Sequence, residues 1–337
     1  MSEEILKVEN LKTYFFTASG VAKAVDGVSY TLKKGEILGI VGESGSGKSV
    51  SASSVIRLLP KTGRVVDGTI LFEGKDMRKI SDKELRKIRG NEISVIFQDP
   101  MTSLDPVFKV GSQMVELIRT HNNVSKEEAR KIAVKNLELM GIPDPERRMN
   151  AYPHELSGGM CQRVMIAMAI SCHPKFMIAD EPTTALDVTV QAQVLGLLKE
   201  LQEKTNTAIM LITHNLGIVW KMCDTVMVMY AGKTVEFADM KELYKNPLHP
   251  YTWGLLDSIP KLSDTEKAEL KAIPGTPPDL RLTGKCCNFY NRCPYATDIC
   301  REQVPELIEV APGHKVACHH QNGVETLVRG KETASNE

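Results

Sequence analysis

The residues most suited to chemistry form a glycine-rich run that ends in a lysine and a serine, from Gly42 to Ser49. The run fits the pattern G-x-x-x-x-G-K-[ST] and lies between the apolar segment 37–41 and a segment with helical periodicity. In such a loop, backbone N–H groups surround phosphate oxygens, and the start of the helix adds a positive field. Lys48 is expected to pair with the β- and γ-phosphates, and Ser49 to coordinate Mg²⁺. The pattern therefore predicts a nucleoside triphosphate site made by Gly42, Ser44, Gly45, Ser46, Gly47, Lys48, Ser49 and Val50.

Two adjacent carboxylates, Asp180 and Glu181, follow the short apolar segment 176–179, which is typical of a strand buried on both faces. An acid at the end of such a strand can hold the water shell of Mg²⁺, which is the role expected of Asp180. Glu181 is placed to polarise an attacking water. Together with the glycine-rich loop, this pair predicts hydrolysis of the bound triphosphate.

A second phosphate-facing element is predicted at Leu156-Ser-Gly-Gly-Met160, where a serine and two glycines begin a helix. The amides of Gly158 and Gly159 and the hydroxyl of Ser157 are expected to face an anion. With this element in place, residues 5–258 resemble the nucleotide-binding subunits of ABC transporters, whose signature is Leu-Ser-Gly-Gly-Gln. Met160 departs from that signature, but the phosphate-facing groups are retained, so function is expected to be preserved.

The resemblance implies roles for three more residues. Gln98 matches the glutamine that reaches Mg²⁺ and senses the γ-phosphate, and His214 matches the histidine that contacts the γ-phosphate. Asp187 matches the aspartate of the D-loop, which also belongs to the nucleotide site. The family stacks an aromatic side chain from its first hairpin on adenine; strand spacing favours Phe15, with Tyr14 as the alternative.

The resemblance also implies a mechanism, because the signature of one subunit covers ATP on the glycine-rich loop of the other. ATP is expected to close a head-to-tail dimer, and hydrolysis to reopen it. The Mg²⁺ ligands implied are Ser49, Gln98 and Asp180; the catalytic groups are Glu181, His214 and Gln98. A lone subunit is expected to hydrolyse ATP poorly.

These residues need elements that position them, and the chain supplies strands alternating with helices, which predicts an α/β fold. We expect a RecA-like, mainly parallel sheet, an antiparallel β subdomain near the N-terminus, and a helical subdomain at about residues 99–160. Residues 112–140 are expected to be helical, with a capping box from Ser125 to Glu128. Residues 1–258 are predicted to form the ATPase domain, and residues 259–337 a loop-rich appendage.

The appendage narrows the expected subfamily. The segments 246–252, 274–278 and 287–294, with 97–106, resemble the ATPase subunits of dipeptide and oligopeptide importers, and nickel importers share much of the pattern. The resemblance implies transmembrane permeases as partners, a second ATP-binding subunit (a paralogue or a copy of this chain), and, indirectly, an extracytoplasmic peptide-binding protein. Nothing in the chain is expected to touch the transported solute.

Four cysteines of the appendage, Cys287, Cys293, Cys300 and Cys318, form the spacing C-x₅-C-x₆-C-x₁₇-C. Four thiolates can bind zinc or hold a [4Fe–4S] cluster, and the spacing lacks the paired C-x₂-C of many zinc sites. The family resemblance favours the cluster, while zinc, disulfides and free thiols stay open. The neighbouring Cys286 leaves the identity of the first ligand open as well.

Composition limits the alternatives. Lys plus Arg equals Asp plus Glu at 42 each, so no overall basic field attracts nucleic acid, which is not expected as a partner. The N-terminus lacks signal-peptide character and no apolar run is long enough to span a bilayer, which predicts a peripheral protein on the cytoplasmic face of the membrane. The rival hypotheses are a soluble ABC ATPase acting on DNA or ribosomes, and a metal-binding regulator with a vestigial ATPase.

Overall fold

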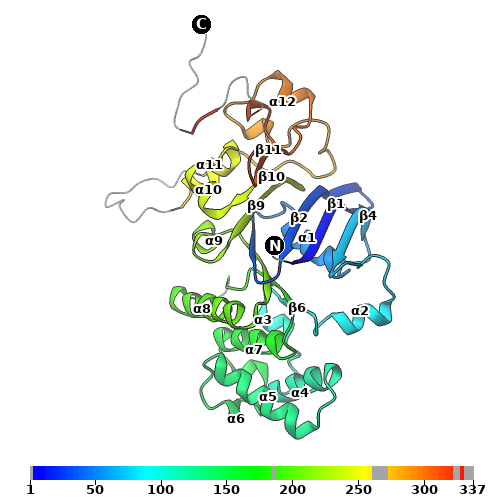
Figure 1. The fold of residues 1–337 in the computed structure, drawn as a ribbon, viewed down its shortest axis with the longest axis vertical. Helices are drawn as coiled ribbons and strands as arrows, with labels where there is room; N and C mark the ends of the chain where they lie inside the picture. Colours follow the sequence, from blue (N-terminus) through cyan, green and yellow to red (C-terminus); the bar gives the residue numbers. More distant parts are fainter. Residues whose placement is uncertain (1–2, 184–186, 260–271, 322–326, 330–337) are drawn as a thin grey trace, which may run out of the picture. The chain divides into compact units, whose positions relative to one another are not determined.

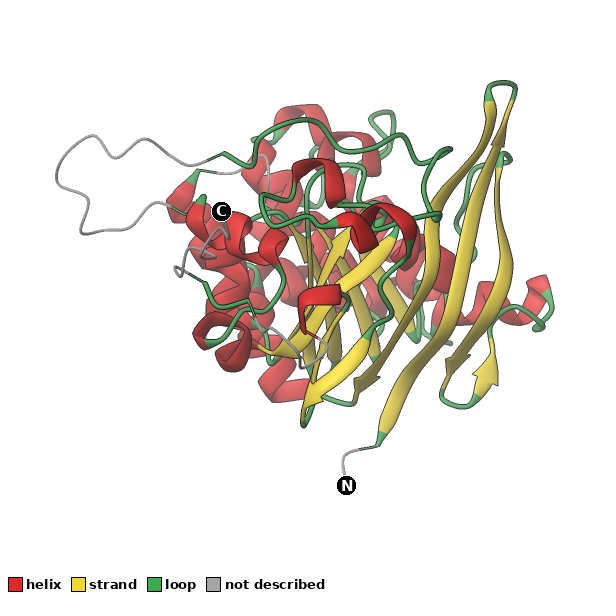
Figure 2. Cartoon of the chain, turned by 90° about the horizontal axis from the view of Figure 1, so that it is seen from above, coloured by secondary structure: helices red, strands yellow, loops and turns green. Residues whose placement is uncertain are grey.

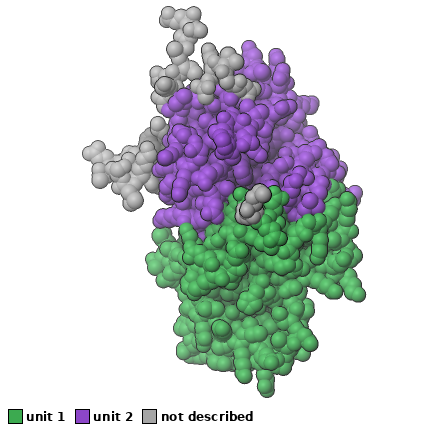
Figure 3. Space-filling model, viewed as in Figure 1, with its two compact units in different colours: residues 1–6, 32–37, 72–212 green, residues 7–31, 38–71, 213–337 purple. Residues whose placement is uncertain are grey.

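The computed structural model describes residues 3–183, 187–259, 272–321 and 327–329. These residues form two compact units, coloured separately in Figure 3. Unit 1 contains residues 1–6, 32–37 and 72–212, and unit 2 contains residues 7–31, 38–71 and 213–337. The glycine-rich loop therefore belongs to unit 2, and the Asp180–Glu181 pair belongs to unit 1.

Unit 1 contains three parallel strands, β6 (Ile93–Ile96), β7 (Phe176–Asp180) and β8 (Ala208–Thr213), with β7 in the middle. Every residue of β8 is buried, as are the first four of β7. Continuous apolar runs of this kind are typical of strands covered on both faces, so the predicted parallel α/β core is confirmed.

The helices of unit 1 include the predicted helical region. Helix α7 (Gly158–Ile170) packs against α4 (Val110–His121) and α5 (Lys126–Leu139), all drawn in green shades in Figure 1. The remaining helices are α2 (Asp82–Ile88), α3 (Pro100–Ser103), α6 (Pro145–Arg148) and α8 (Val188–Thr205), with a 3₁₀ turn η1 (Pro153–Glu155).

The stretch 112–140 is helical as predicted, and it is divided between two helices. It contains most of α4 and all of α5, because Asn122 ends α4 in an extended conformation. The expected capping box is confirmed at the start of α5, where the Ser125 hydroxyl accepts from the Glu128 amide and the Glu128 carboxylate accepts from the Ser125 amide. The box begins a new helix, and it is the reason for the break in the middle of the apolar pattern.

Unit 2 contains most of a sheet in which β1 (Glu4–Thr17) lies between β2 (Gly20–Lys33) and β4 (Gly63–Phe72). These are the long strands in Figure 2. Only two residues connect β1 to β2, and neighbouring strands joined so tightly are antiparallel. The predicted antiparallel subdomain is thus present; the short β5 (Lys75–Asp76) belongs to unit 1.

A second set of strands in unit 2 supports the glycine-rich loop. Strand β3 (Ile37–Val41) pairs in parallel with β9 (Thr225–Tyr230), and β9 pairs antiparallel with β10 (Lys233–Asp239). The C-terminal region extends this set, because β12 (His314–Val316) pairs with β10 and β11 (Ile308–Ala311) pairs with β12. The other elements of unit 2 are α1 (Lys48–Val55), α9 (Leu216–Met222), α10 (Met240–Lys245), α11 (Pro250–Asp257), α12 (Asp298–Glu302), η2 (Tyr290–Arg292) and η3 (His319–Gln321).

The C-terminal region is fastened to β10 by a fully buried carboxylate, Glu236. Its oxygens accept from the amides of Leu248 and His249, at 2.7 and 3.0 Å, and the His314 ring lies 2.9 Å away. A buried carboxylate is tolerated only when hydrogen bonds replace its water. Specific polar contacts therefore join Leu248, His249 and His314 to β10 within unit 2.

Candidate functional site

The glycine-rich loop connects β3 to α1 and is shaped by its lysine. Lys48 is buried, and its Nζ donates to the carbonyls of Gly42 and Glu43 at 2.7 and 2.9 Å. These contacts hold the ammonium inside the ring of the loop, next to the start of α1. The geometry is that of an anion-binding loop with its cation already in place.

Two glycines of the loop are required by the neighbouring backbone. A Cβ on Gly42 would lie 2.1 Å from the carbonyl oxygen of Met229, and a Cβ on Gly47 would lie 2.2 Å from that of Ala24. Both glycines also have positive φ, +150° and +102°, which L side chains rarely adopt. The loop thus lies directly on β2 and β9, where only glycine fits.

One hydroxyl group of the loop, that of Ser46, lacks a hydrogen-bond partner in the described part of the structure. Ser46 is buried, and its Oγ has no hydrogen-bond partner among the residues that the structure describes. Buried polar atoms are nearly always paired, so an exception indicates a missing partner such as a ligand or water. The unpaired Ser46 hydroxyl is consistent with the prediction that this loop binds phosphate.

Gln98 and Glu181, separated by 83 positions in the chain, meet in unit 1. The Gln98 amide donates to the Glu181 carboxylate at 3.0 Å. Glu181 has φ +46°, in the left-handed region, and its amide donates to the Ile212 carbonyl at 2.9 Å. Non-glycine residues held in this conformation are frequent at functional sites. The strained turn directs Glu181 away from the strand that carries Asp180, toward Gln98.

The Ser157 region begins α7 as predicted. The Ser157 hydroxyl caps the helix by accepting from the Met160 amide at 3.3 Å. A Cβ on Gly158 would meet no atom of the described chain within 4 Å, so packing does not require glycine there. Asp187 likewise caps α8, accepting from two amides at 3.0 Å; residues 184–186, which precede it in the D-loop, lie outside the described residues.

The two aromatic candidates for adenine stacking lie on opposite faces of β1. The Thr13 hydroxyl contacts that of Ser54 in α1 at 2.8 Å, so by strand alternation Phe15 faces the same side as α1. Tyr14 is engaged elsewhere: its hydroxyl donates to Asp26 at 2.8 Å, and burial, together with this bond, raises its pKa to about 12. Geometry therefore agrees with the preference for Phe15.

The predicted site residues fall into two groups. Gln98, Ser157, Gly158, Gly159, Asp180, Glu181 and Asp187 belong to unit 1, while Tyr14, Phe15, the loop 42–50 and His214 belong to unit 2. Within the first group, the structure places Gln98 and Glu181 in hydrogen-bond contact. Contacts that need both units, such as Lys48 with Asp180, stay predictions.

The sequence reasoning missed that the appendage reaches the glycine-rich loop. Arg292 forms an ion pair with Glu43, the second residue of the loop, at 2.5 Å. Three rings pack together beside the pair: Tyr230, Tyr251 and Phe289 have centroids 4.6–5.4 Å apart, and the Arg292 guanidinium lies 5.7 Å from the Tyr230 ring centre. Arg292 stands in the segment 287–294, but no local signal connects it with a residue 249 positions away.

The four cysteines predicted to bind a metal, Cys287, Cys293, Cys300 and Cys318, are all free thiols. None of the eight cysteines forms a disulfide. Burial raises the pKa values of Cys287 and Cys318 to about 12 and that of Cys293 to about 11, and neighbouring cysteines, Cys300 among them in each case, add to the rise. The described residues contain no group of three or more His, Cys, Asp or Glu arranged to hold a metal ion. The four-cysteine metal site therefore stays a prediction.

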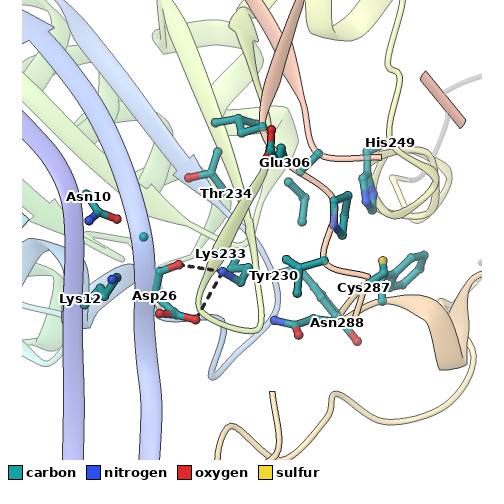
Figure 4. A pocket seen from close by; sticks show the side chains of 17 residues that line it. Asn10, Lys12, Asp26, Tyr230, Lys233, Thr234, His249, Cys287, Asn288 and Glu306 are labelled. Atoms are coloured by element: carbon teal, nitrogen blue, oxygen red, sulfur yellow. Dashed lines mark hydrogen bonds and ion pairs between the residues drawn. The ribbon is translucent and has the colours of Figure 1, made fainter. Parts of the chain in front are cut away.

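A cavity of about 530 Å³ in unit 2 reaches one of these cysteines (Figure 4). Cys287 and Asn288 line it on the appendage side, with Tyr230 and Lys233 from the β9–β10 hairpin. Lys233 contacts the carbonyl and carboxylate of Asp26 at 3.1 and 3.3 Å, so its charge is compensated. Of the four predicted metal ligands, Cys287 is the one among the residues lining this cavity.

A pH-dependent stability is expected from His249, which is buried and accepts from the Tyr251 amide through Nδ1 at 3.0 Å. Burial lowers its pKa to about 3. Because the unfolded chain takes up this proton near pH 6.5, the contribution is complete above pH 6.5 and is lost as the pH falls toward 3. Between about pH 7.5 and 5 the loss should be about 2 kcal/mol.

Urea denaturation at the two pH values measures this loss. His249→Asn keeps an acceptor for the helix cap but does not titrate, so its stability should fall less between the two pH values than that of the wild type, by about the same 2 kcal/mol. Equal pH dependence in both proteins would show that His249 is not the titrating group.

Comparisons with known proteins agree with this site. The family model described as ABC transporter matches residues 25–184, and the model described as Oligopeptide/dipeptide transporter, C-terminal region, matches residues 235–300. The chain is 50% identical over 96% of its length to a probable peptide ABC transporter ATP-binding protein of Sinorhizobium fredii, covering 97% of that protein. It is 53% identical over 93% of its length to the oligopeptide transport ATP-binding protein OppD of Bacillus subtilis, covering 87% of it.

Solved structures show the same fold. A dimeric ATP-binding cassette in a post-hydrolysis state, bound to ADP and Pi, matches 70% of this chain and 98% of its own, with a TM-score of 0.64 and 27% identity. A component of an ABC transporter complex from Clostridium perfringens, cbiO1, matches 72% of this chain and 91% of its own, with a TM-score of 0.61 and 32% identity. Among the described residues, no helix combines the length and apolar character needed to cross a membrane.

Proposed function

This chain belongs to the ATP-binding proteins of oligopeptide and dipeptide ABC transporters, and we propose on that premise that it hydrolyses MgATP to drive peptide import through partner permeases. The observation that carries the proposal is a complete phosphate-binding loop, with Lys48 seated inside it, in a chain whose C-terminal region matches the oligopeptide/dipeptide transporter model. The peptide substrate follows from the names of the relatives, which are peptide, oligopeptide and dipeptide transport proteins.

The catalytic roles follow the chemistry of each position. Glu181 polarises the attacking water. Gln98 donates to the Glu181 carboxylate, orients that carboxylate and senses the γ-phosphate. Asp180, Ser49 and Gln98 supply the oxygens for Mg²⁺, which takes hard oxygen ligands. His214, exposed directly after β8, contacts the γ-phosphate, and Phe15 stacks on adenine.

The phosphate-facing start of α7 acts in a head-to-tail dimer. Gly158 is exposed and has open space around it, which supports a surface kept free for a ligand held by a facing subunit. Met160 keeps its amide in the cap with Ser157, so the exchange of glutamine for methionine leaves the helix start intact. The facing subunit is a paralogue or a second copy of this chain.

The proposed setting is the cytoplasmic face of the membrane, with the chain held there by transmembrane permeases and supplied by an extracytoplasmic peptide-binding protein. Residues 1–258 act as the ATPase domain and residues 259–337 as its appendage. The alternative of a nickel importer lacks support from the relatives' names, which refer to peptides.

Reconstitution tests the proposal. The chain is co-expressed with the transmembrane permeases and second ATP-binding subunit of a peptide importer, and ATP hydrolysis is measured in proteoliposomes with a peptide-binding protein and added peptides. Peptide should stimulate turnover, and Ni²⁺ should not. Stimulation by Ni²⁺ alone, or purification with nucleic acid or ribosomes without permeases, would contradict the proposal.

We further propose that Cys287, Cys293, Cys300 and Cys318 hold a [4Fe–4S] cluster. The support is chemical: none of the four thiols forms a disulfide, and burial together with neighbouring cysteines raises the pKa values of Cys287, Cys293 and Cys318. A zinc ion requires all ligands at about 2.3 Å from one point, whereas a cluster of four irons accepts thiolates spread around its corners. The cluster is proposed over zinc because the resemblance to peptide-importer ATPases favours it.

Anaerobically purified protein is expected to be brown and to contain about four irons per chain. Cys318→Ser should lower the iron content and bleach the visible absorption, whereas Cys172→Ser, which changes a buried cysteine outside the group, should leave both unchanged. Colourless protein with one zinc per chain, or with neither metal, would remove the cluster.

A further inference from the structure

Glu43, the second residue of the phosphate-binding loop, is held by the C-terminal region on two sides. Its carboxylate accepts from Nη1 and Nη2 of Arg292, at 2.5 and 2.9 Å. Its amide donates to the Tyr251 hydroxyl at 2.8 Å, and its carbonyl accepts from Lys48 at 2.9 Å. One residue therefore connects the appendage with the lysine that faces the phosphates.

Arg292 is built into this position and has no freedom to pair elsewhere. Its side chain is 4% exposed. Besides Glu43, Nε donates to the Pro274 carbonyl at 2.8 Å, Nη2 to the Ile273 carbonyl at 3.1 Å, and Nη1 to the Tyr230 hydroxyl at 3.3 Å. A guanidinium has five N–H donors, and these contacts use all five. Among these described partners of Arg292, Glu43 is the one that carries a negative charge.

The pair is also held on its apolar side. The guanidinium lies 5.7 Å from the ring centre of Tyr230, and Tyr230 packs against Tyr251 and Phe289. A buried cation that loses its carboxylate is strongly unfavourable, so Arg292 and Glu43 must keep their relative positions. The first half of the loop is thereby fixed to a rigid aromatic cluster.

We propose that Arg292 is a positioning residue for the phosphate-binding loop: through Glu43, the C-terminal region sets the loop's affinity for the phosphates of ATP. The inference rests on the proposed ATPase function but not on the cluster. Its consequence is that a change in the appendage reaches the nucleotide site along a defined contact, even though none of its residues lies in a nucleotide-binding motif.

Glu43→Gln gives the sharpest test, because positioning and simple charge predict opposite signs. Glu43 is an anion beside a site for an anion, so removing its charge alone should tighten ATP binding. If Glu43 positions the loop, its loss should weaken binding, by roughly tenfold, the scale of a charge-assisted contact. The measurement is the Kd of the full-length protein for a fluorescent ATP analogue, with the thermal midpoint recorded as a check on folding.

Arg292→Gln and the double variant complete a double-mutant cycle with Glu43→Gln. Arg292→Gln should weaken binding by a similar factor, and the double variant should be no weaker than either single one, because both changes break the same contact. Tyr251→Phe removes only the hydroxyl that holds the Glu43 amide and should weaken binding by a smaller factor. The matched control is Arg301→Gln, since Arg301 lies on α12 with its side chain 66% exposed; its Kd should stay within twofold.

The outcomes separate the two proposals. Wild-type protein that does not bind ATP would end the proposed function. If the wild type binds ATP, and a folded Glu43→Gln variant binds it equally well or more tightly, the inference about Arg292 and Glu43 is wrong. The proposed function then still stands. Should Glu43→Gln or Arg292→Gln fail to fold, Tyr251→Phe decides, because it leaves both charges of the ion pair in place: unchanged ATP binding in that variant would contradict the inference.

Discussion

Replacing Glu181 by glutamine is expected to lower ATP turnover by about 10²–10⁴-fold, the range for removing a general base. Glutamine keeps the size of the side chain and an oxygen that can accept from Gln98, so the turn at this position should be preserved. The affinity for ATP should change little, because the carboxylate acts on the water and not on the nucleotide. The measurement is steady-state phosphate release by the assembled transporter, with ATP binding assayed in parallel.

The control for Glu181 is Glu200→Gln in α8, where the carboxylate makes an exposed ion pair with Lys204. Turnover should stay within twofold of the wild type in this variant. Turnover within twofold for Glu181→Gln as well would assign the base elsewhere.

Gly158→Asp is expected to abolish turnover while leaving the isolated chain as stable as the wild type or more stable. Open space surrounds the position, and a carboxylate in the first turn of a helix is favoured by the helix dipole by about 0.3–1 kcal/mol. In the dimer the same carboxylate would face the triphosphate held by the other subunit. Repulsion there should prevent closure and reduce phosphate release by at least about 100-fold, roughly 3 kcal/mol.

Gly196→Asp supplies the matched control, because Gly196 is also an exposed helical glycine where an added Cβ would meet no atom of the described chain within 4 Å. It stands in the interior of α8 and should leave turnover unchanged. Thermal denaturation of both variants separates folding from activity. A stable Gly158→Asp protein with normal turnover would show that the start of α7 does not face a nucleotide.

Much of this protein is determined by local sequence. The loop 42–49 is recognisable because phosphate binding needs glycines and a lysine at fixed spacing between a strand and a helix. Buried strands such as 176–180 and 208–213 are read from continuous apolar runs, and the capping box at Ser125 from two side chains three positions apart. Each of these signals is complete within a dozen residues, so it can be recognised without any tertiary contact.

The phosphate-binding loop itself illustrates what tertiary structure alone decided. The pattern 42–49 predicts what the loop binds, but its glycines at 42 and 47 are required by the backbones of Met229 and Ala24, which no local pattern reveals. Glu43 occupies a variable position of the pattern, yet it bears the ion pair with Arg292. An ion pair between a buried arginine and a half-buried glutamate depends on two charges meeting where water is largely excluded, and only the folded chain brings residues 249 positions apart to that place.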